Sequence, residues 1–404
     1  MRMIAALVAV VASLAALALA TEDKWHATAP TAAAGAPAAV AEKTAPDSPF
    51  VEDHADHQQV YTALTWAIYD TLNYAAPSSA NLPEANDAEG HPMWFDAADG
   101  DDVPVTLAQT LFFTEQFDNL DRLFDDWSKS KDLTADGRWR LASFHFAMTA
   151  EFSRAANWAR DYPRIQRWRQ AKPQSPAAAI AETVYWFCGA WSARGNGAAS
   201  DATREGFELF EERLGKAEKA LLESKSYASS NPLWYHEYIA VAGSQSRGPG
   251  AVLALVEEAS RENPTFEANY VAATNFLTPK WGGDWALVDK FARTAVALTR
   301  DRLGQSMYLR VYLAATDCRC KGYRLLEDTY ATWPQLKASF EDLVRLYPHS
   351  AYDASVYAAY ACVAGDGQTY RRLRFRLGGA AVAAAYSPNY SKDVCDRKFP
   401  ASPT

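Results

Sequence analysis

The chain has 404 residues, of which 13% are aromatic and 22% are charged, and its formal net charge at pH 7 is −9. Acidic and basic residues are interspersed, and the sequence lacks the basic cluster that would neutralise a phosphate backbone. This charge pattern argues against a nucleic acid as the partner.

The first 20 residues are typical of a secretory signal peptide. Arg2 precedes a continuous apolar run that ends in Ala18-Leu19-Ala20, the small-residue pattern found before a cleavage site. We expect cleavage after Ala20 and a periplasmic or secreted mature protein. No later window offers the ~20 apolar residues of a membrane span. We therefore expect a protein that is not membrane-spanning.

Two segments separate the signal peptide from the main domain. Residues 21–49 are rich in Ala, Pro and Thr and have little bulky apolar surface, which predicts a disordered leader. Residues 50–103 combine one helix, in which apolar residues recur at helical spacing, with a long loop rich in Pro, Asn, Asp and Gly. We predict that the main domain begins at Pro104.

From residue 104 to 390 apolar residues recur at helical spacing almost without interruption, and the alternation of apolar and polar residues typical of strands is missing. One predicted helix, Thr203 to Lys225, has a continuous apolar stripe. Asn231-Pro232 and Asn263-Pro264 are 32 residues apart (263 − 231), close to the ~34-residue tetratricopeptide period. The prediction is an all-α fold, a tetratricopeptide-like helical repeat array of antiparallel helix pairs, followed by a tail at 391–404.

The chain contains 5 cysteines, an odd number for a compartment in which disulfides persist. Cys188 lies in the apolar run VYWFCGAW, so we expect it to be buried and unpaired. Cys318 and Cys320 are separated by one residue and are poorly placed to bond each other. We therefore expect each of these two to pair with Cys362 or Cys395.

Two segments place tryptophan beside a cation. In Ala190–Gly197 (AWSARGNG), Trp191 and Arg194 are three residues apart on a last helical turn, Gly195 is the expected left-handed terminator, and Gly197 belongs to the same turn. The cation also complements the C-terminal dipole of the helix. Helix termination alone accounts for this pattern. The functional interpretation is that Arg194 offers charge beside an aromatic face.

The second segment, LTPKWGGDW, ends one predicted helix and begins the next. Five of its residues have local roles in stopping the first helix, reversing the chain, capping the second helix and starting its apolar stripe: Pro279, Gly282, Gly283, Asp284 and Trp285. Lys280 and Trp281 have no such role. The candidate binding residues are therefore Trp191, Arg194, Lys280, Trp281 and Trp285, with an acidic or extended peptide as the expected ligand.

The stretches Ala190–Gly197, Phe210-x-x-Arg213-Leu214, Asn231–Tyr235 and Pro279–Gly283 resemble the bacterial family known as domain of unknown function 4034. The resemblance extends over roughly 107–386. It implies a helical, tetratricopeptide-like fold. Since the family has no established activity, the resemblance adds no catalytic residue.

Metal sites find little support in the sequence. His54 and His57 are three residues apart on a predicted helix, but a zinc site needs further ligands, so we interpret that helix as solvated. The acidic run 96–102 lacks the ligand spacing of an EF-hand. His236-Glu237 lacks the second histidine of His-Glu-x-x-His. We expect no metal and no cofactor.

Catalytic motifs are also missing. The stretch 243–248 (GSQSRG) is not a Gly-x-Ser-x-Gly elbow, and no phosphate-binding Gly-x-x-x-x-Gly-Lys occurs. Export together with 13 Trp and 20 Tyr leaves open an α/α enzyme or binding protein for cell-envelope glycans. We expect most of these aromatic residues to be in the core. The preferred hypothesis is a periplasmic scaffold, not an enzyme, that binds a peptide or protein of the envelope.

Overall fold

The computed structural model describes residues 102–154, 158–195, 202–316, 323–386 and 390–400, with the backbone alone at positions 102 and 103. Contacts divide the chain into units 1–54 and 55–404, and every described residue belongs to the second unit. Within the described ranges the regular structure is helical, apart from one bridge between Leu133 and Trp139. The all-α prediction is confirmed.

The α-helices of the described residues follow in chain order. They are α3 (Asp102–Phe113), α4 (Phe117–Ser130), α5 (Ala142–Phe152), α6 (Trp158–Ala171), α7 (Pro176–Arg194), α8 (Arg204–Ala228), α9 (Pro232–Ser244), α10 (Pro249–Ser260), α11 (Glu267–Asn275), α12 (Trp285–Leu303), α13 (Ser306–Thr316), α14 (Leu325–Asp328), α15 (Trp333–Leu346), α16 (Ala351–Val363), α17 (Gly367–Leu377) and α18 (Lys392–Lys398). Short 3-10 turns are η4 (Pro279–Trp281), η5 (Gly378–Ala380) and η6 (Ala383–Ala385).

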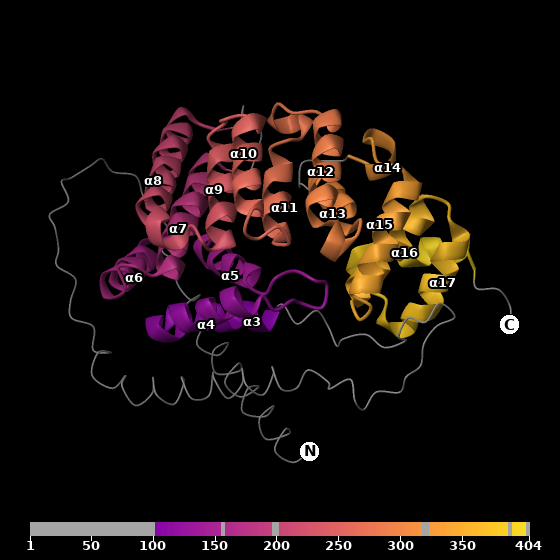
Figure 1. Cartoon of the computed structure of the whole chain (residues 1–404), viewed down its shortest axis with the longest axis horizontal. Helices are drawn as coiled ribbons and strands as arrows, with labels where there is room; N and C mark the ends of the chain where they lie inside the picture. Colours follow the sequence, from indigo (N-terminus) through magenta and orange to yellow (C-terminus); the bar gives the residue numbers. More distant parts are fainter. Residues whose placement is uncertain (1–101, 155–157, 196–201, 317–322, 387–389, 401–404) are drawn as a thin grey trace, which may run out of the picture. The chain divides into compact units, whose positions relative to one another are not determined.

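The helices pack as neighbouring pairs, as a repeat array requires. Helix α7 lies against α8, α9 against α10, α12 against α13, and α16 against α17 (Figure 1). In addition, α7 packs on both α5 and α9, and α11 packs on both α9 and α13. Helices α5, α7, α9, α11 and α13 therefore form one continuous row, which continues through α15 to α16.

Local sequence explains where several helices begin. The predicted helix 203–225 is confirmed as α8: Thr203 caps it by accepting a hydrogen bond from the Gly206 amide (3.0 Å). The predicted stripe is buried at Phe210 and Leu214, and Glu212 pairs with Lys216 four residues on. Burial of the stripe contributes far more to stability than this solvent-exposed ion pair.

Aromatic side chains fill the interior, as expected for most of them. The largest fully buried side chains include three tryptophans, Trp127, Trp168 and Trp234. The buried residues form two main clusters, one over the helices from α3 to α9 and one over those from α9 to α18. Because α9 contributes to both clusters, the apolar core continues along the array.

Two boundaries differ from the predictions. Helix α11 ends at Asn275, four residues before Pro279, because the chain tightens there into a turn in which the Leu277 amide donates to the Thr274 carbonyl. Pro279 instead begins η4, where its missing amide hydrogen costs nothing. The predicted tail contains helix α18, which packs on α16.

Several predictions fall outside the described residues. They concern the signal peptide, the leader, the helix and loop at 50–103, His54 and His57, the acidic run 96–102, Gly197, Cys318 and Cys320. Within the described part, no helix has both the length and the apolarity needed to cross a membrane.

Candidate functional site

The two tryptophan–cation segments meet in space. Trp191 at the end of α7 and Trp281 in η4 contact edge to face, with ring centroids 6.0 Å apart. The Arg194 guanidinium lies 5.2 Å from the Trp191 ring centre, and the Lys280 ammonium lies 6.0 Å from that of Trp281. We call these four residues the tryptophan–cation surface. Both rings are half-buried, and Lys280 is exposed.

Packing holds this surface in place. Trp281 contacts Phe276 edge to face at 5.1 Å, and Trp191 contacts Phe210 at the same distance. Position 243 in α9 requires glycine, because a Cβ at Gly243 would come within 2.3 Å of the Phe276 ring. Trp281 therefore fixes the junction of α7, α9 and α11 while it keeps part of its ring exposed.

The other predicted residues of these segments have structural roles. Gly195 ends α7 and Gly282 follows η4, both with φ near +80°, a value that favours glycine. A Cβ at Gly283 would come within 2.0 Å of the Leu277 carbonyl oxygen. Asp284 caps α12 by accepting from the Leu287 amide (2.7 Å). Trp285 packs on Tyr323 and is not part of the tryptophan–cation surface.

A histidine–glutamate cluster joins α5 to α9. It consists of His145, His236 and Glu237, whose potential ligand atoms lie within 4.8 Å of one another. His145 Nδ1 lies 2.6 Å from Glu237 Oε1, and the two imidazole rings contact edge to face at 4.5 Å. His236 Nδ1 lies 3.1 Å from the Ala268 carbonyl oxygen.

The two histidines differ in their electrostatics. Burial lowers the pKa of His145, but the charge and hydrogen bond of Glu237 outweigh burial and raise that pKa above its usual value. Burial and the neighbouring His145 lower the pKa of His236 to about 4. His236 is therefore neutral at pH 7, whereas Glu237 favours the protonated form of His145.

A second polar group surrounds Arg310 of α13. This Arg310 cluster comprises Arg310, Asp136 and Arg138 from the loop before α5, Glu267 of α11 and Asp353 of α16. Arg310 donates a hydrogen bond to the Asp136 carbonyl, and Arg138 Nε donates to Asp136 Oδ2 at 2.7 Å. The loop fits closely against α15, because a Cβ at Gly137 would come within 2.0 Å of the Tyr347 ring.

The carboxylates of the Arg310 cluster have strongly shifted pKa values. Burial raises the pKa of Glu267 to about 7, although Arg310 lowers it in part. Burial likewise raises the pKa of Asp353 to about 7, and Arg310 again lowers it in part. For Asp136 burial is outweighed by Arg138 and Arg310, so its pKa lies below the usual value. Perturbed titration of this kind is common at functional sites.

Several buried polar atoms of these two clusters have no hydrogen-bond partner in the described part of the structure. They are Glu237 Oε2, Glu267 Oε1, Asp353 Oδ2, and Nδ2 and Oδ1 of the neighbouring Asn269. A buried polar atom that makes no hydrogen bond lowers the stability of the fold by about 1–3 kcal/mol. The two clusters are adjacent, because the Ala268 carbonyl that contacts His236 lies between Glu267 and Asn269 in the chain.

The sequence interpretation missed both clusters. For the Arg310 cluster, the sequence did contain one indication, a single charged residue within an otherwise apolar helix. The two examples are Arg310 in SMYLRVYLAAT and Asp353 in AYDASVYAAYACV. Such a charge is almost never buried without a partner. The sequence does not show which charges meet, since their partners lie on other helices.

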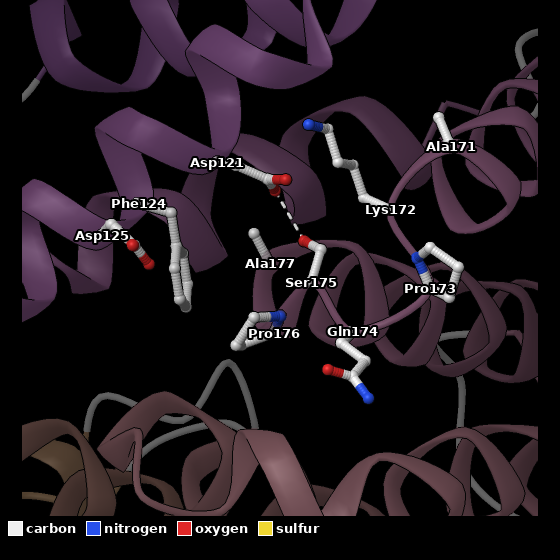
Figure 2. A pocket seen from close by; sticks show the side chains of 10 residues that line it. All are labelled: Asp121, Phe124, Asp125, Ala171, Lys172, Pro173, Gln174, Ser175, Pro176 and Ala177. Atoms are coloured by element: carbon white, nitrogen blue, oxygen red, sulfur yellow. Dashed lines mark hydrogen bonds between the residues drawn. The ribbon is translucent and has the colours of Figure 1, made fainter.

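A separate cavity of about 630 Å³ lies between α4 and the turn from α6 to α7 (Figure 2). One of the carboxylates that line it is the half-buried Asp121, whose Oδ1 accepts from Ser175 Oγ (2.6 Å) and Trp168 Nε1 (3.2 Å). Ser175 in turn caps α7 by accepting from the Ala178 amide. Asp121 therefore anchors the start of α7, and helix packing accounts for this carboxylate.

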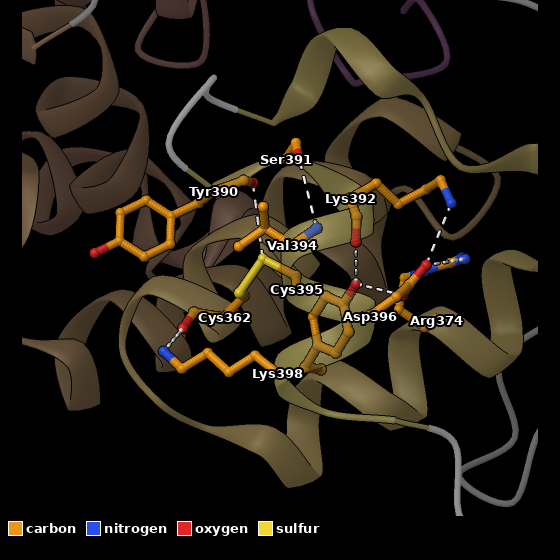
Figure 3. The surroundings of a disulfide bond; sticks show 10 residues. Cys362, Arg374, Tyr390, Ser391, Lys392, Val394, Cys395, Asp396 and Lys398 are labelled. Carbon is orange, nitrogen blue, oxygen red and sulfur yellow. Dashed lines mark hydrogen bonds and ion pairs between the residues drawn. A yellow bond between two sulfur atoms is a disulfide. The ribbon is translucent and has the colours of Figure 1, made fainter.

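The cysteines correct the predicted pairing. Cys362 of α16 bonds Cys395 of α18, with a Cα–Cα distance of 5.8 Å (Figure 3). Since these two bond each other, neither is available to Cys318 or Cys320, so the predicted pairing was wrong. Cys188 is buried and unpaired, as predicted. Burial raises the pKa of its thiol to about 12, which keeps it protonated and unreactive.

Fold and sites together define an all-α helical-repeat protein with an aromatic, cationic surface and a buried row of polar groups. Residues 106–215 match the family model described as Domain of unknown function (DUF4034). The match confirms the resemblance for α3 to α7 and the first half of α8, and it ends before His236 and Trp281. No curated protein and no solved structure matches the chain.

Proposed function

We propose that the protein is an exported helical-repeat scaffold that binds an extended, acidic peptide segment of a cell-envelope protein at the tryptophan–cation surface. One observation carries the proposal: two tryptophan–cation pairs 90 residues apart (281 − 191) meet on one surface. Packing requires the rings and the end of α7 favours a cation at Arg194, but neither requires that Lys280 lie beside Trp281.

The chemistry of this surface suits a peptide with carboxylate side chains. Half-buried indole rings offer flat apolar contact at low entropic cost, and the two cations attract carboxylates. A cation–π contact contributes about 0.5–1 kcal/mol at an exposed site, which favours a position of each cation beside its ring. Stacked helix pairs are commonly used to bind peptides in this way.

Export is part of the proposal. The N-terminal apolar run with Ala18-Leu19-Ala20 predicts cleavage. The Cys362–Cys395 disulfide is typical of proteins in oxidising compartments. Mass spectrometry of the protein from a periplasmic fraction is expected to give a mature N-terminus at Thr21. An intact Met1, or recovery from the cytosol alone, would contradict export.

Peptide binding is tested by calorimetric titration of the mature protein with a 12-residue peptide of alternating Glu and Ser, and with its Lys-Ser counterpart. Lys280→Glu is expected to weaken binding of the acidic peptide at least tenfold. Lys290, which is also exposed and lies on α12, provides the matched control: Lys290→Glu is expected to bind the acidic peptide normally. Equal affinity for both peptides would sink the proposal. Binding of envelope polysaccharide instead would favour the glycan alternative.

A further inference from the structure

The histidine–glutamate cluster has the composition of a metal site. Among the described residues it is the one set of three such side chains whose ligand atoms lie within 4.8 Å of one another. Two imidazole nitrogens and one carboxylate oxygen are the ligands of many catalytic zinc sites. His236 and Glu237 come from one helix and His145 from another, so two packed helices fix their positions.

An ion pair between His145 and Glu237 does not account for the whole cluster. Glu237 is fully buried, yet its Oε2 has no hydrogen-bond partner in the described residues. A buried carboxylate that served only to pair with His145 would be expected to have both oxygens satisfied. One oxygen of Glu237 is therefore available to a further ligand inside the protein.

The orientation of the His236 ring also suits a metal ligand. A carbonyl oxygen only accepts hydrogen bonds, so the contact with Ala268 requires that Nδ1 carry the hydrogen. In the neutral ring Nε2 then has a free lone pair. A histidine that binds a metal through one nitrogen typically donates the other to a carbonyl or a carboxylate, which fixes the ring. The Ala268 carbonyl has this role here.

We propose that His145, His236 and Glu237 form a binding site for Zn²⁺. Imidazole nitrogen disfavours hard cations such as Ca²⁺ and Mg²⁺ and suits Zn²⁺. Ligand atoms at ~2.0–2.2 Å from a tetrahedral zinc ion are about 3.4 Å apart. One potential ligand atom from each of the three side chains already lies within 4.8 Å of the other two, so zinc binding needs shifts of only about 1–2 Å.

The site also has a route of entry and an open position. The His145 side chain is 17% exposed and His236 is half-buried, so an ion reaches the cluster from their side. Three protein ligands leave a fourth position of the zinc tetrahedron to a water molecule or to an added ligand. The site shares no residue with the tryptophan–cation surface, and the inference does not depend on the proposed peptide.

The test uses the full mature chain, freed of metal with a chelator and titrated with zinc against a chromophoric competitor. We expect one zinc ion per chain. His145→Ala, His236→Ala and Glu237→Gln are each expected to weaken binding at least about 100-fold, because loss of an outer partner alone costs 10–100-fold. His349→Ala, a histidine on the turn after α15, is the matched control and is expected to bind zinc normally.

A second measurement does not depend on how these variants fold. X-ray absorption of zinc bound to the His54→Ala/His57→Ala chain is expected to show two imidazoles and a carboxylate. This chain retains the whole cluster and lacks the N-terminal histidine pair. Loss of zinc from it, a ligand shell with fewer than two imidazoles, or undiminished binding by His236→Ala would each overturn the proposal.

Discussion

Carboxylates pack into helix junctions in two regions of the molecule, around Arg310 and around the Cys362–Cys395 disulfide. In the Arg310 cluster, Glu267 and Asp353 are buried with one oxygen each lacking a partner in the described residues. Burial raises the pKa of both carboxyls to about 7. Ionisation of these groups opposes folding.

The C-terminal region satisfies its carboxylates instead. Asp366 caps α17 and accepts from Lys337 Nζ (2.8 Å), so its pKa is held far below the usual value against the effect of burial. Asp396 accepts from the Tyr370 hydroxyl (2.6 Å) and from Arg374 (3.0 Å), which lies beside it in Figure 3. Its pKa falls to about 2 despite burial.

The contrast separates two uses of a buried charge. At the C-terminus each carboxylate has donors on the neighbouring helices, so its ionised form stabilises the packing. Around Arg310 the buried carboxylates of Glu267 and Asp353 lack enough hydrogen-bond donors, which lowers the stability of the fold. Such an arrangement is typical of functional sites. The same applies to Glu237, whose unpartnered oxygen is assigned above to a metal ion.

The largest effect is expected at the C-terminus, where the disulfide closes 33 residues of chain. Cys362→Ala/Cys395→Ala is expected to lower the free energy of unfolding by about 4 kcal/mol, because the open chain gains entropy when unfolded. Denaturant titration with and without reductant measures this. Reductant is expected to reproduce the loss in the wild type and to leave the double variant unchanged. A reductant effect of equal size in that variant would contradict the assignment.

The next effect compares the two arginines. Arg310→Gln is expected to lower the free energy of unfolding by about 3 kcal/mol, since it leaves buried carboxylates without their cation. Arg374→Gln is the matched control: its partner Asp396 is 37% exposed and keeps other donors, so about 1 kcal/mol or less is expected. Urea titration at pH 7 measures the free energy of unfolding of both variants. Equal decreases would contradict the proposed difference between the Arg310 cluster and the C-terminal region.

The smallest effect is the dependence of stability on pH. Glu267 and Asp353 have pKa values near 7 in the folded protein, above those of the unfolded chain, so the folded state binds protons more tightly. Their contribution to stability is complete below about pH 4 and is lost as the pH rises through 7. Glu267→Gln is therefore expected to stabilise the protein at pH 8 by about 1–3 kcal/mol.

Asp396 provides the opposite control. Its folded pKa of about 2 lies below the unfolded value, so its contribution is present above about pH 4 and is lost on acidification towards 2. Asp396→Asn is expected to destabilise the protein at pH 8 and to change little near pH 2. Thermal unfolding of both variants across pH 2–8 tests the two signs. The first would be refuted if the Glu267→Gln variant were no more stable than the wild type at pH 8.

Sequence reasoning predicted the parts of the fold that depend on near neighbours. The apolar stripe of α8 and the cap at Asp284 are local features, in which spacing along one helix or one turn decides the outcome. It also selected Trp191 and Trp281, since each forms a tryptophan–cation pair with a residue near it in the chain. It did not predict that these two pairs meet.

Tertiary structure alone decided the remainder. His145 and Glu237 are 92 positions apart, and their contact depends on how α5 and α9 pack through α7. The choice of Cys362 and Cys395 as partners depends on α18 lying against α16, which the spacing of the cysteines does not reveal. Composition and period determined an all-α repeat protein, because helix formation and burial of a stripe are local. The packing of distant helices determined which charges, rings and thiols meet, since those contacts follow from the sum of many small side-chain fits.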